Sequence, residues 1–298
     1  MTTTLSPSRP ATRPSSLRDI DACTRRRRRR SQWVRWSLMI AMGIAIAPLA
    51  LIILQVIVRG WPALGWEFFT QAEPPHRREG GGYLQGIVGT LYMVGIASVL
   101  AVPLGIMGAV YLTEYGRGWL PKIVRFFSDV MTGVPSVFVG LFVYTALVQQ
   151  FRFGTIMGAI GLAIMMLPII VRSSEEMLRL VPEDQRAASA GLGARKWQTI
   201  AKVVLPSAVP GLTTGAMLAV ARAAGETAVL LLTALGSLTV VTAFSGVAQS
   251  SMSLLIYRGA TQPFDPGKER AWAGALVLMG IVFLLTIAAR YITARSRR

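Results

Sequence analysis

The sequence predicts an all-α membrane protein, a polytopic bundle of six transmembrane helices. Of its 298 residues, 53% are hydrophobic and only 15% are charged, a balance that is unusual for a soluble domain. Apolar runs recur along the chain, and each approaches or exceeds the roughly 20 residues that a helix needs to cross about 30 Å of hydrocarbon. Helices are favoured there because they satisfy their own backbone hydrogen bonds.

The first 32 residues are predicted to be a disordered tail. They are rich in Ser, Thr, Pro and Arg, contain six consecutive arginines at 25–30, and hold too little apolar surface to pack. The apolar run at 34–58 is longer than the roughly 7 to 15 apolar residues of a cleaved signal segment. We therefore expect it to remain as the first span of a membrane domain over residues 33–295.

Further spans are expected at 84–112, 123–148, 154–171, 205–235 and 271–289. Glycine and proline inside these runs would weaken a soluble helix, but in lipid they allow close helix approach or local kinks. Thr132, Gly133, Pro135 and Ser136 mark a place where a broken helix would expose backbone donors, or where small residues simply permit packing.

Lysine and arginine are distributed unevenly between alternate loops. The segments 1–35, 113–125, 173–202 and 290–298 hold 22 of the 31, whereas the loops 59–83, 149–153 and 236–270 hold seven. Because basic residues collect on the cytoplasmic side of membrane proteins, both termini are predicted to be cytoplasmic. The basic residues of the cytoplasmic segments explain the net charge of +17 better than nucleic-acid binding does. The arginine run at 25–30 is expected to rest on anionic membrane lipids.

Several kinds of enzyme site lack the residues that they need. The single cysteine, Cys23, lies in the tail, and the single histidine, His76, lies in a polar loop, where we expect a solvated bystander. An internal disulfide, a Cys/His metal site and a Ser/His/Asp set are therefore unavailable. No G-x-x-x-x-G-K-[ST] motif is present to hold ATP phosphates. The chain is predicted to be no enzyme and to bind no cofactor or metal itself.

Charged residues within the apolar runs are the candidates for function. Arg222 lies inside one run, where a charge costs about 2.5 to 3.5 kcal/mol on insertion scales. Glu226 is four residues on, so the two are expected to share one helical face and to pair within the bundle. The pair either fixes helix orientation alone or lies on an anion pathway, since guanidinium offers oxyanions a planar fork of donors. Arg172 is either a second anion contact or an ordinary positive-inside residue.

The polar loop before the fifth run contains a predicted surface helix. Pro182 stands at its first turn, acidic residues favour its N-terminus, and Gly191 and Gly193 end it. The segment RAASAGLGA followed by KWQTIAKVVLP resembles the cytoplasmic loop of ABC-importer permeases, in which a Glu-Ala-Ala segment, a later glycine and a distal Leu-Pro form the coupling helix. Gly193 and the Leu205-Pro206 pair match that pattern.

The resemblance implies a coupling helix at about 183–196 that would dock on an ATPase. Its candidate residues are Glu183, Asp184, Arg186, Ala187, Ala188 and Gly193. Ala187 is a departure, because it stands where the family usually has its glutamate. Glu183 or Asp184, about one helical turn earlier, is the alternative acidic contact.

Three stretches resemble the phosphate-specific permeases of ABC importers, most closely the PstA type: TGVPSVFVGLF at 132–142, LPIIVRSSEEMLRLVP at 167–182 and ARAAGETAVLLLTA at 221–234. The resemblance covers residues 34–292. It implies a type I (MetI-like) importer permease in the inner membrane that translocates inorganic phosphate. It also implies a PstC-type permease, two PstB-type subunits that bind ATP and Mg, and a PstS-type extracytoplasmic phosphate-binding protein as partners.

Other functions stay open. A permease for phosphonate, sulfate or molybdate would use similar donors, although a carboxylate neighbour favours a protonatable anion. A stand-alone anion channel or carrier would explain Arg222 with Glu226 but would not need the coupling helix. A sensory subunit would report phosphate status through the basic tail.

Overall fold

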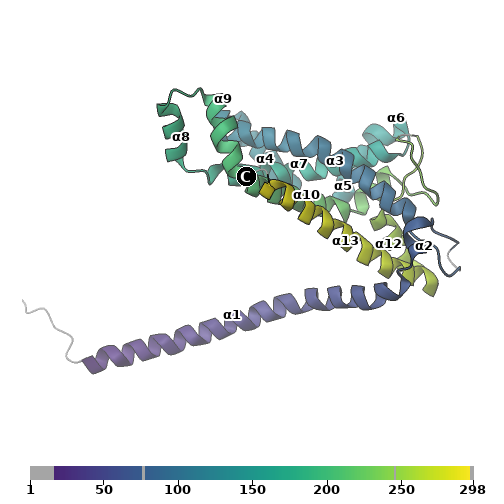
Figure 1. The fold of residues 1–298 in the computed structure, drawn as a ribbon, viewed down its shortest axis with the longest axis horizontal. Helices are drawn as coiled ribbons and strands as arrows, with labels where there is room; N and C mark the ends of the chain where they lie inside the picture. The colour runs from purple at the N-terminus through teal and green to yellow at the C-terminus, as the bar shows by residue number, and fades with distance from the viewer. Residues whose placement is uncertain (1–16, 76–77, 245, 296–298) are drawn as a thin grey trace, which may run out of the picture. The chain divides into compact units, whose positions relative to one another are not determined.

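The computed structural model describes residues 17–75, 78–244 and 246–295, and it divides into two units between residues 55 and 56. The first unit holds most of helix α1 (Leu17–Gly60), and the second holds the remaining helices (Figure 1). His76 and residues 1–16 of the predicted tail lie outside the described residues.

Helix α1 begins earlier than the first predicted span. Residues 17–32, for which the sequence predicts disorder, form the first part of the helix. Arginine is a good helix former, and no glycine or proline occurs between residues 17 and 42, so the backbone continues its helix without a local break. Pro48 lies inside α1, within the apolar run, where such a residue is tolerated.

Helices make up nearly all of the second unit. They are η1 (Trp61–Ala63), α2 (Trp66–Thr70), α3 (Leu84–Val110), η2 (Tyr111–Tyr115), α4 (Leu120–Gly133), α5 (Ser136–Val143), η3 (Tyr144–Val148), α6 (Gln149–Phe151), α7 (Thr155–Arg179), α8 (Glu183–Gly191), α9 (Lys196–Thr199), η4 (Ile200–Val204), α10 (Leu205–Ala224), α11 (Ala228–Thr233), α12 (Met252–Thr261) and α13 (Asp265–Arg295). The elements η2, η3 and η4 are π-helical turns that continue α-helices.

The predicted membrane bundle is confirmed. Within the described residues, five helical segments are long and apolar enough to cross a membrane, and the pair α4 and α5 provides a sixth span if it is counted as one. That pair is bent by 107°, so the span expected over 123–148 is broken, as the first of the two alternatives for residues 132–136 requires. Pro135 causes the break, because its ring excludes helical backbone at the preceding residue and it has no N–H to donate.

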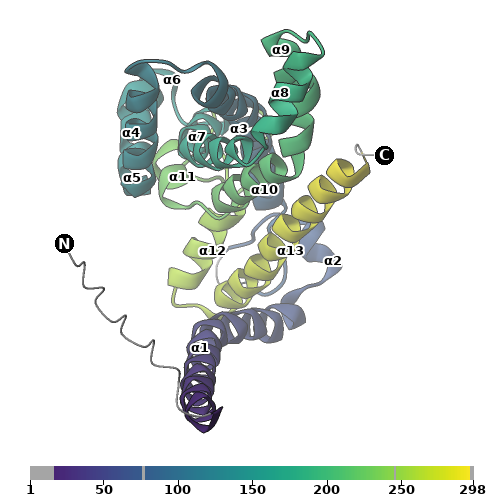
Figure 2. The same cartoon turned by 90° about the vertical axis from the view of Figure 1, so that its left-hand side faces the viewer.

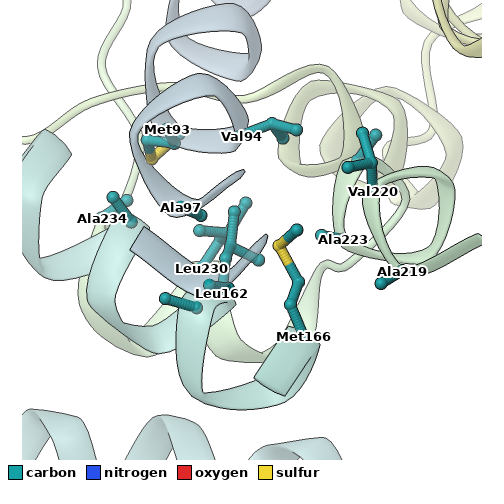
Figure 3. Packing of buried hydrophobic residues seen from close by; sticks show 14 of the residues in the cluster. Met93, Val94, Ala97, Leu162, Met166, Ala219, Val220, Ala223, Leu230 and Ala234 are labelled. Carbon is teal, nitrogen blue, oxygen red and sulfur yellow. The ribbon is translucent and has the colours of Figure 1, made fainter. Parts of the chain in front are cut away.

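Helix α7 lies at the centre of the second unit and packs against α3, α4 and α10 (Figures 1 and 2). Small residues allow these helices to approach closely. At Gly105 of α3, a Cβ atom would lie only 2.6 Å from Cγ2 of Ile170 in α7. Figure 3 shows the core of this packing, with Met93, Val94, Ala97, Leu162, Met166, Ala219, Val220, Ala223, Leu230 and Ala234.

The segment between α11 and α12 contains irregular backbone that is buried in the bundle. Gln249, Ser250 and Ser251 are at most 1% exposed. The backbone N–H of Met252 donates to the Thr90 hydroxyl of α3 at 2.9 Å, so the segment is held against that helix. Gly89 makes this approach possible, because a Cβ atom there would lie 1.8 Å from the Ser250 carbonyl oxygen.

The end of the bundle opposite α8 is held by a buried arginine. Arg270 of α13 donates to the carbonyl oxygens of Arg78 at 2.6 Å and of Gly80 at 3.2 Å. Tyr83 is fully buried beside it, and burial, reinforced by the charge of Glu73, raises the pKa of its phenol well above the usual value. The phenol therefore stays neutral, and this polar cluster fixes the loop that precedes α3.

We predict that Gly89→Ala is disruptive whereas Gly95→Ala, in the same helix, is tolerated. A methyl group at residue 89 would collide with backbone, and such overpacking costs about 1–3 kcal/mol or more. At residue 95 nothing lies within 4 Å of the added atom, and alanine is the better helix former. Thermal unfolding of the purified protein in detergent measures both; equal melting temperatures would contradict the packing described for residues 249–251.

Candidate functional site

The fifth predicted span is interrupted next to its charged residues. Helix α10 ends at Ala224 and α11 begins at Ala228, so the prediction of one continuous helix over 205–235 is wrong. Glycine at position 225 disfavours a continued helix, and the N–H groups of Gly225 and Glu226 donate to carbonyl oxygens three residues back, each at 3.2 Å. The Ser253 hydroxyl of α12 donates to the Glu226 carbonyl oxygen at 2.8 Å. The break is therefore hydrogen-bonded from both sides.

The predicted pairing of Arg222 with Glu226 is absent from this conformation. No ion pair or hydrogen bond joins the two side chains, both of which belong to the described part of the chain. Pairing at a spacing of four needs a continuous helix, and the helix ends between them. Arg222 instead lies in the last turn of α10, where a positive charge is favourable to the helix dipole.

Arg222 lies on an open face of α10. Thr214, Leu218 and Arg222 recur at a spacing of four residues and are all exposed in the isolated chain. The other face of the helix is buried against the bundle, through Gly215, Ala216, Ala219, Val220 and Ala223. The open face therefore combines a guanidinium and a hydroxyl on an otherwise apolar helix, which is the chemistry needed to contact an anion.

Arg172 belongs to an ion-pair network at the end of α7. Its guanidinium lies 3.6 Å from Asp129, 3.6 Å from Glu175 and 3.7 Å from Glu176, and its side chain is 43% exposed. Three carboxylates surround it, unlike Arg222. Its predicted role as an anion contact stays a prediction.

Glu175 is the centre of that network, and sequence reasoning missed it. Its side chain is 2% exposed, and its carboxylate accepts from Arg125 of α4 at 2.6 Å and from Arg179 of α7 at 2.5 Å. Arg125 also donates to the carbonyl oxygen of Leu112, at the end of the α3 span. One buried carboxylate thus joins α3, α4 and α7. Its local partners, Arg172 three residues before and Arg179 four residues after, were the signals visible in the sequence.

The predicted coupling helix is shorter than expected. Helix α8 spans Glu183–Gly191 with Pro182 as its N-cap, and Gly193 has a positive φ of 82° that turns the chain toward α9. The prediction of one helix to residue 196 is wrong, because this left-handed backbone favours glycine and cannot continue a helix.

The exposed face of α8 contains most of the predicted coupling residues. Glu183, Asp184, Ala187 and Ala188 are exposed, and the following Leu192 is 90% exposed. Arg186 differs, since it points into the protein and forms an ion pair with Glu114 at 3.0 Å. An acidic first turn and an apolar tip therefore form a small protruding surface (Figure 1).

We predict that Glu175→Gln destabilises the protein strongly while Glu176→Gln does not. Removing the charge of the buried carboxylate takes the shared partner from three arginines, and a hydrogen bond to a charged group contributes about 1.5–3 kcal/mol. Glu176 is 61% exposed, and exposed pairs contribute about 0–1 kcal/mol. Unfolding of both variants in detergent would be compared with the unsubstituted protein; similar stabilities would show that Glu175 is not the centre of the network.

Comparison with known proteins identifies the family. Residues 101–298 match the family described as "Binding-protein-dependent transport system inner membrane component". The chain is 41% identical over 264 residues to "Phosphate transport system permease protein PstA 1" of Mycobacterium tuberculosis (strain ATCC 25618 / H37Rv), with 86% of this chain and 85% of the relative covered. It is 37% identical to "Phosphate transport system permease protein PstA" of Yersinia pestis, with 91% and 95% covered.

A solved structure shares the fold. It is a chain of "a bacterial ABC transporter involved in the import of the acidic polysaccharide alginate", with a TM-score of 0.65, 17% identity, and coverage of 89% of this chain and 96% of that chain. The ABC-permease fold and the resemblance to PstA-type permeases, both expected from the motifs, are confirmed. The protein is a multi-pass membrane permease that belongs to the family of binding-protein-dependent transport system inner membrane components.

Proposed function

We propose that the chain is the permease subunit of an ATP-driven importer that moves inorganic phosphate across the cytoplasmic membrane. The observation that carries the proposal is Arg222, an arginine on the open face of an apolar helix that forms no ion pair with any carboxylate of the described residues. Relatives that are 37–41% identical over most of this chain are named phosphate transport permeases, which supports phosphate as the substrate.

The chemistry of guanidinium fits this role. It stays charged at every physiological pH, and its planar fork of donors matches the oxygen atoms of phosphate. Keeping a charge in an apolar span costs about 2.5 to 3.5 kcal/mol on insertion scales, and an unpartnered arginine there needs a functional reason. The open face of α10 would line the pathway, with a second permease on the opposite side.

Glu226 would act on release of the anion. Its carboxylate lies just beyond the helix end and is free of Arg222 in this conformation. If the break closes during transport, the two side chains come within reach of each other. The Glu226 carboxylate then forms an ion pair with Arg222 as phosphate leaves. Arg172 would be a second contact near the cytoplasmic exit, reached once its carboxylate partners separate.

The remaining parts of the importer would be supplied by partners. An extracytoplasmic PstS-type protein would deliver phosphate, a homologous PstC-type permease would complete the pathway, and two PstB-type subunits would bind ATP and Mg. With both termini in the cytoplasm, α8 faces the ATP-binding subunits. Glu183 lies four residues before Ala187 on the same face of α8, so it would supply the acidic contact that Ala187 lacks.

Movement of α8 would link ATP to transport. ATP binding would close the ATP-binding subunits, carry α8 with them and tilt the spans toward an outward-facing state that receives phosphate. Hydrolysis would return the inward-facing state. A stand-alone anion carrier would have no use for the protruding surface of α8, which supports the importer over that alternative.

We predict that Arg222→Gln strongly lowers phosphate uptake without loss of assembly. The test is ATP-dependent uptake of radiolabelled phosphate into proteoliposomes that hold the complete transporter, with assembly and ATP hydrolysis measured alongside. Loss of one charge-assisted contact to the anion, worth about 1.5–3 kcal/mol, is expected to lower uptake by at least tenfold. Glu226→Gln is expected to assemble normally and to change the rate of uptake.

Arg290→Gln is the matched control, because Arg290 is also an exposed arginine near a helix end and should leave uptake unchanged. Normal uptake by Arg222→Gln would contradict a place on the pathway. Competition by unlabelled sulfate, molybdate or phosphonate tests the substrate, and none of them should slow the uptake of labelled phosphate. If the unsubstituted transporter takes up no phosphate but does take up one of these anions when it is labelled, that oxyanion is the substrate.

A further inference from the structure

The turn that ends the α3 span, η2 (Tyr111–Tyr115), receives contacts from both helices of the coupling loop. The carboxylate of Glu114 forms an ion pair with the guanidinium of Arg186 in α8, with an N–O distance of 3.0 Å, and the two side chains are only 12% and 25% exposed. From α9, the Lys196 ammonium donates to the backbone carbonyl oxygen of Glu114 and lies 4.8 Å from the centroid of the Tyr115 ring. Glu114 is thus the common point of attachment for α8 and α9.

Arg186 extends this attachment to the end of α7. Its guanidinium donates to the carbonyl oxygen of Leu178 at 2.9 Å and to that of Val181 at 3.1 Å. Helices α3 and α7 are themselves closely packed at Gly105 and Ile170. One ion pair therefore connects α8 to two helices that have no room to slide past each other at that point.

The contacts between α8 and the segments that follow it are weaker. They are hydrogen bonds between neutral groups, from Ser207 to Gln185 at 3.4 Å and between the hydroxyls of Ser189 and Thr199 at 3.0 Å. Charge-assisted hydrogen bonds are roughly twice as strong as neutral ones. The charged contacts of Arg186 therefore hold α8 to α3 and α7 more firmly than these two neutral hydrogen bonds hold it to α9 and α10.

We infer that Glu114 is a positioning residue that makes the coupling loop, α8 and α9, move as one body with α3 and α7. The inference rests on the proposed function, in which an ATPase moves α8. Helix α9 continues through η4 into α10, and α10 packs on α7, so movement of this body displaces α10 and the break that follows Arg222. Glu114 touches neither ATP nor the anion and acts only through Arg186 and Lys196.

A double-mutant cycle in the complete transporter tests this role. Glu114→Gln keeps the size of the side chain and removes its charge, Arg186→Gln removes the partner, and the double variant removes both. Glu114→Gln is expected to lower the phosphate moved per ATP hydrolysed by about fivefold or more, with assembly and ATP hydrolysis retained. Glu114→Gln should add no further loss to Arg186→Gln, because both variants break one link. Glu269→Gln, an exposed carboxylate at the far end of the bundle, should be neutral.

A distance measurement gives a second readout that is independent of the substrate. Spin labels would replace Ala188 on α8 and the exposed Arg117 just after η2, with Cys23→Ser to remove the native thiol. The Ala188–Arg117 distance distribution should be narrow and equal with and without ATP, and Glu114→Gln should broaden it. If the unsubstituted transporter moves no phosphate, the proposed function fails while this distance still tests Glu114.

Two results would overturn the inference. One is an unchanged distance distribution together with unchanged phosphate moved per ATP in Glu114→Gln. The other is a parallel fall of assembly, ATP hydrolysis and uptake in Glu114→Gln, with a further loss in the double variant, because that pattern describes a residue needed only for folding.

Discussion

The break after α10 can exist only because the polar backbone groups that it frees find partners inside the bundle. An unpaired N–H or C=O in hydrocarbon costs several kcal/mol, so irregular backbone at membrane depth must be hydrogen-bonded within the protein. The N–H groups at 225 and 226 bond back to α10, and Ser253 bonds to the Glu226 carbonyl. The same requirement explains why polar serines at 250 and 251 are buried beside irregular backbone. Because the helix breaks after residue 224, Arg222 lies at a helix end.

The charged residues divide into two kinds by their partners. Glu175 and Glu114 are nearly buried carboxylates: Glu175 pairs with several arginines and Glu114 with Arg186, and these ion pairs join separate helices. The arginines around the end of α7 and in α8 therefore already have carboxylate partners. Among the described residues Arg222 has no such partner, so an anion entering the bundle would meet an available guanidinium there. The contrast separates the arginines whose ion pairs hold helices together from Arg222, the first proposed contact for the anion.

The sequence predicted those features that depend on local chemistry. Long apolar runs predicted the spanning helices, Pro182 and Gly193 delimited the coupling helix, and Pro135 marked a possible break. Gly225 could not be interpreted in the same way, because glycine in lipid serves close packing as often as it ends a helix. The pairing of Arg125 with Glu175 crosses 50 residues, and that of Glu114 with Arg186 crosses still more, so neither left a local pattern to recognise.

Thiol labelling tests most directly whether the open face of α10 lines an aqueous pathway. Two equally exposed leucines are each replaced by a single cysteine. Leu218, one turn before Arg222, is 64% exposed, and Leu284 of α13 is 66% exposed. In the assembled transporter with Cys23→Ser, Leu218→Cys should react with a membrane-impermeant thiol reagent and be slowed by phosphate, while Leu284→Cys, facing lipid, should stay unreactive. Equal and slow reaction at both positions, unaffected by phosphate, would contradict a pathway along this face.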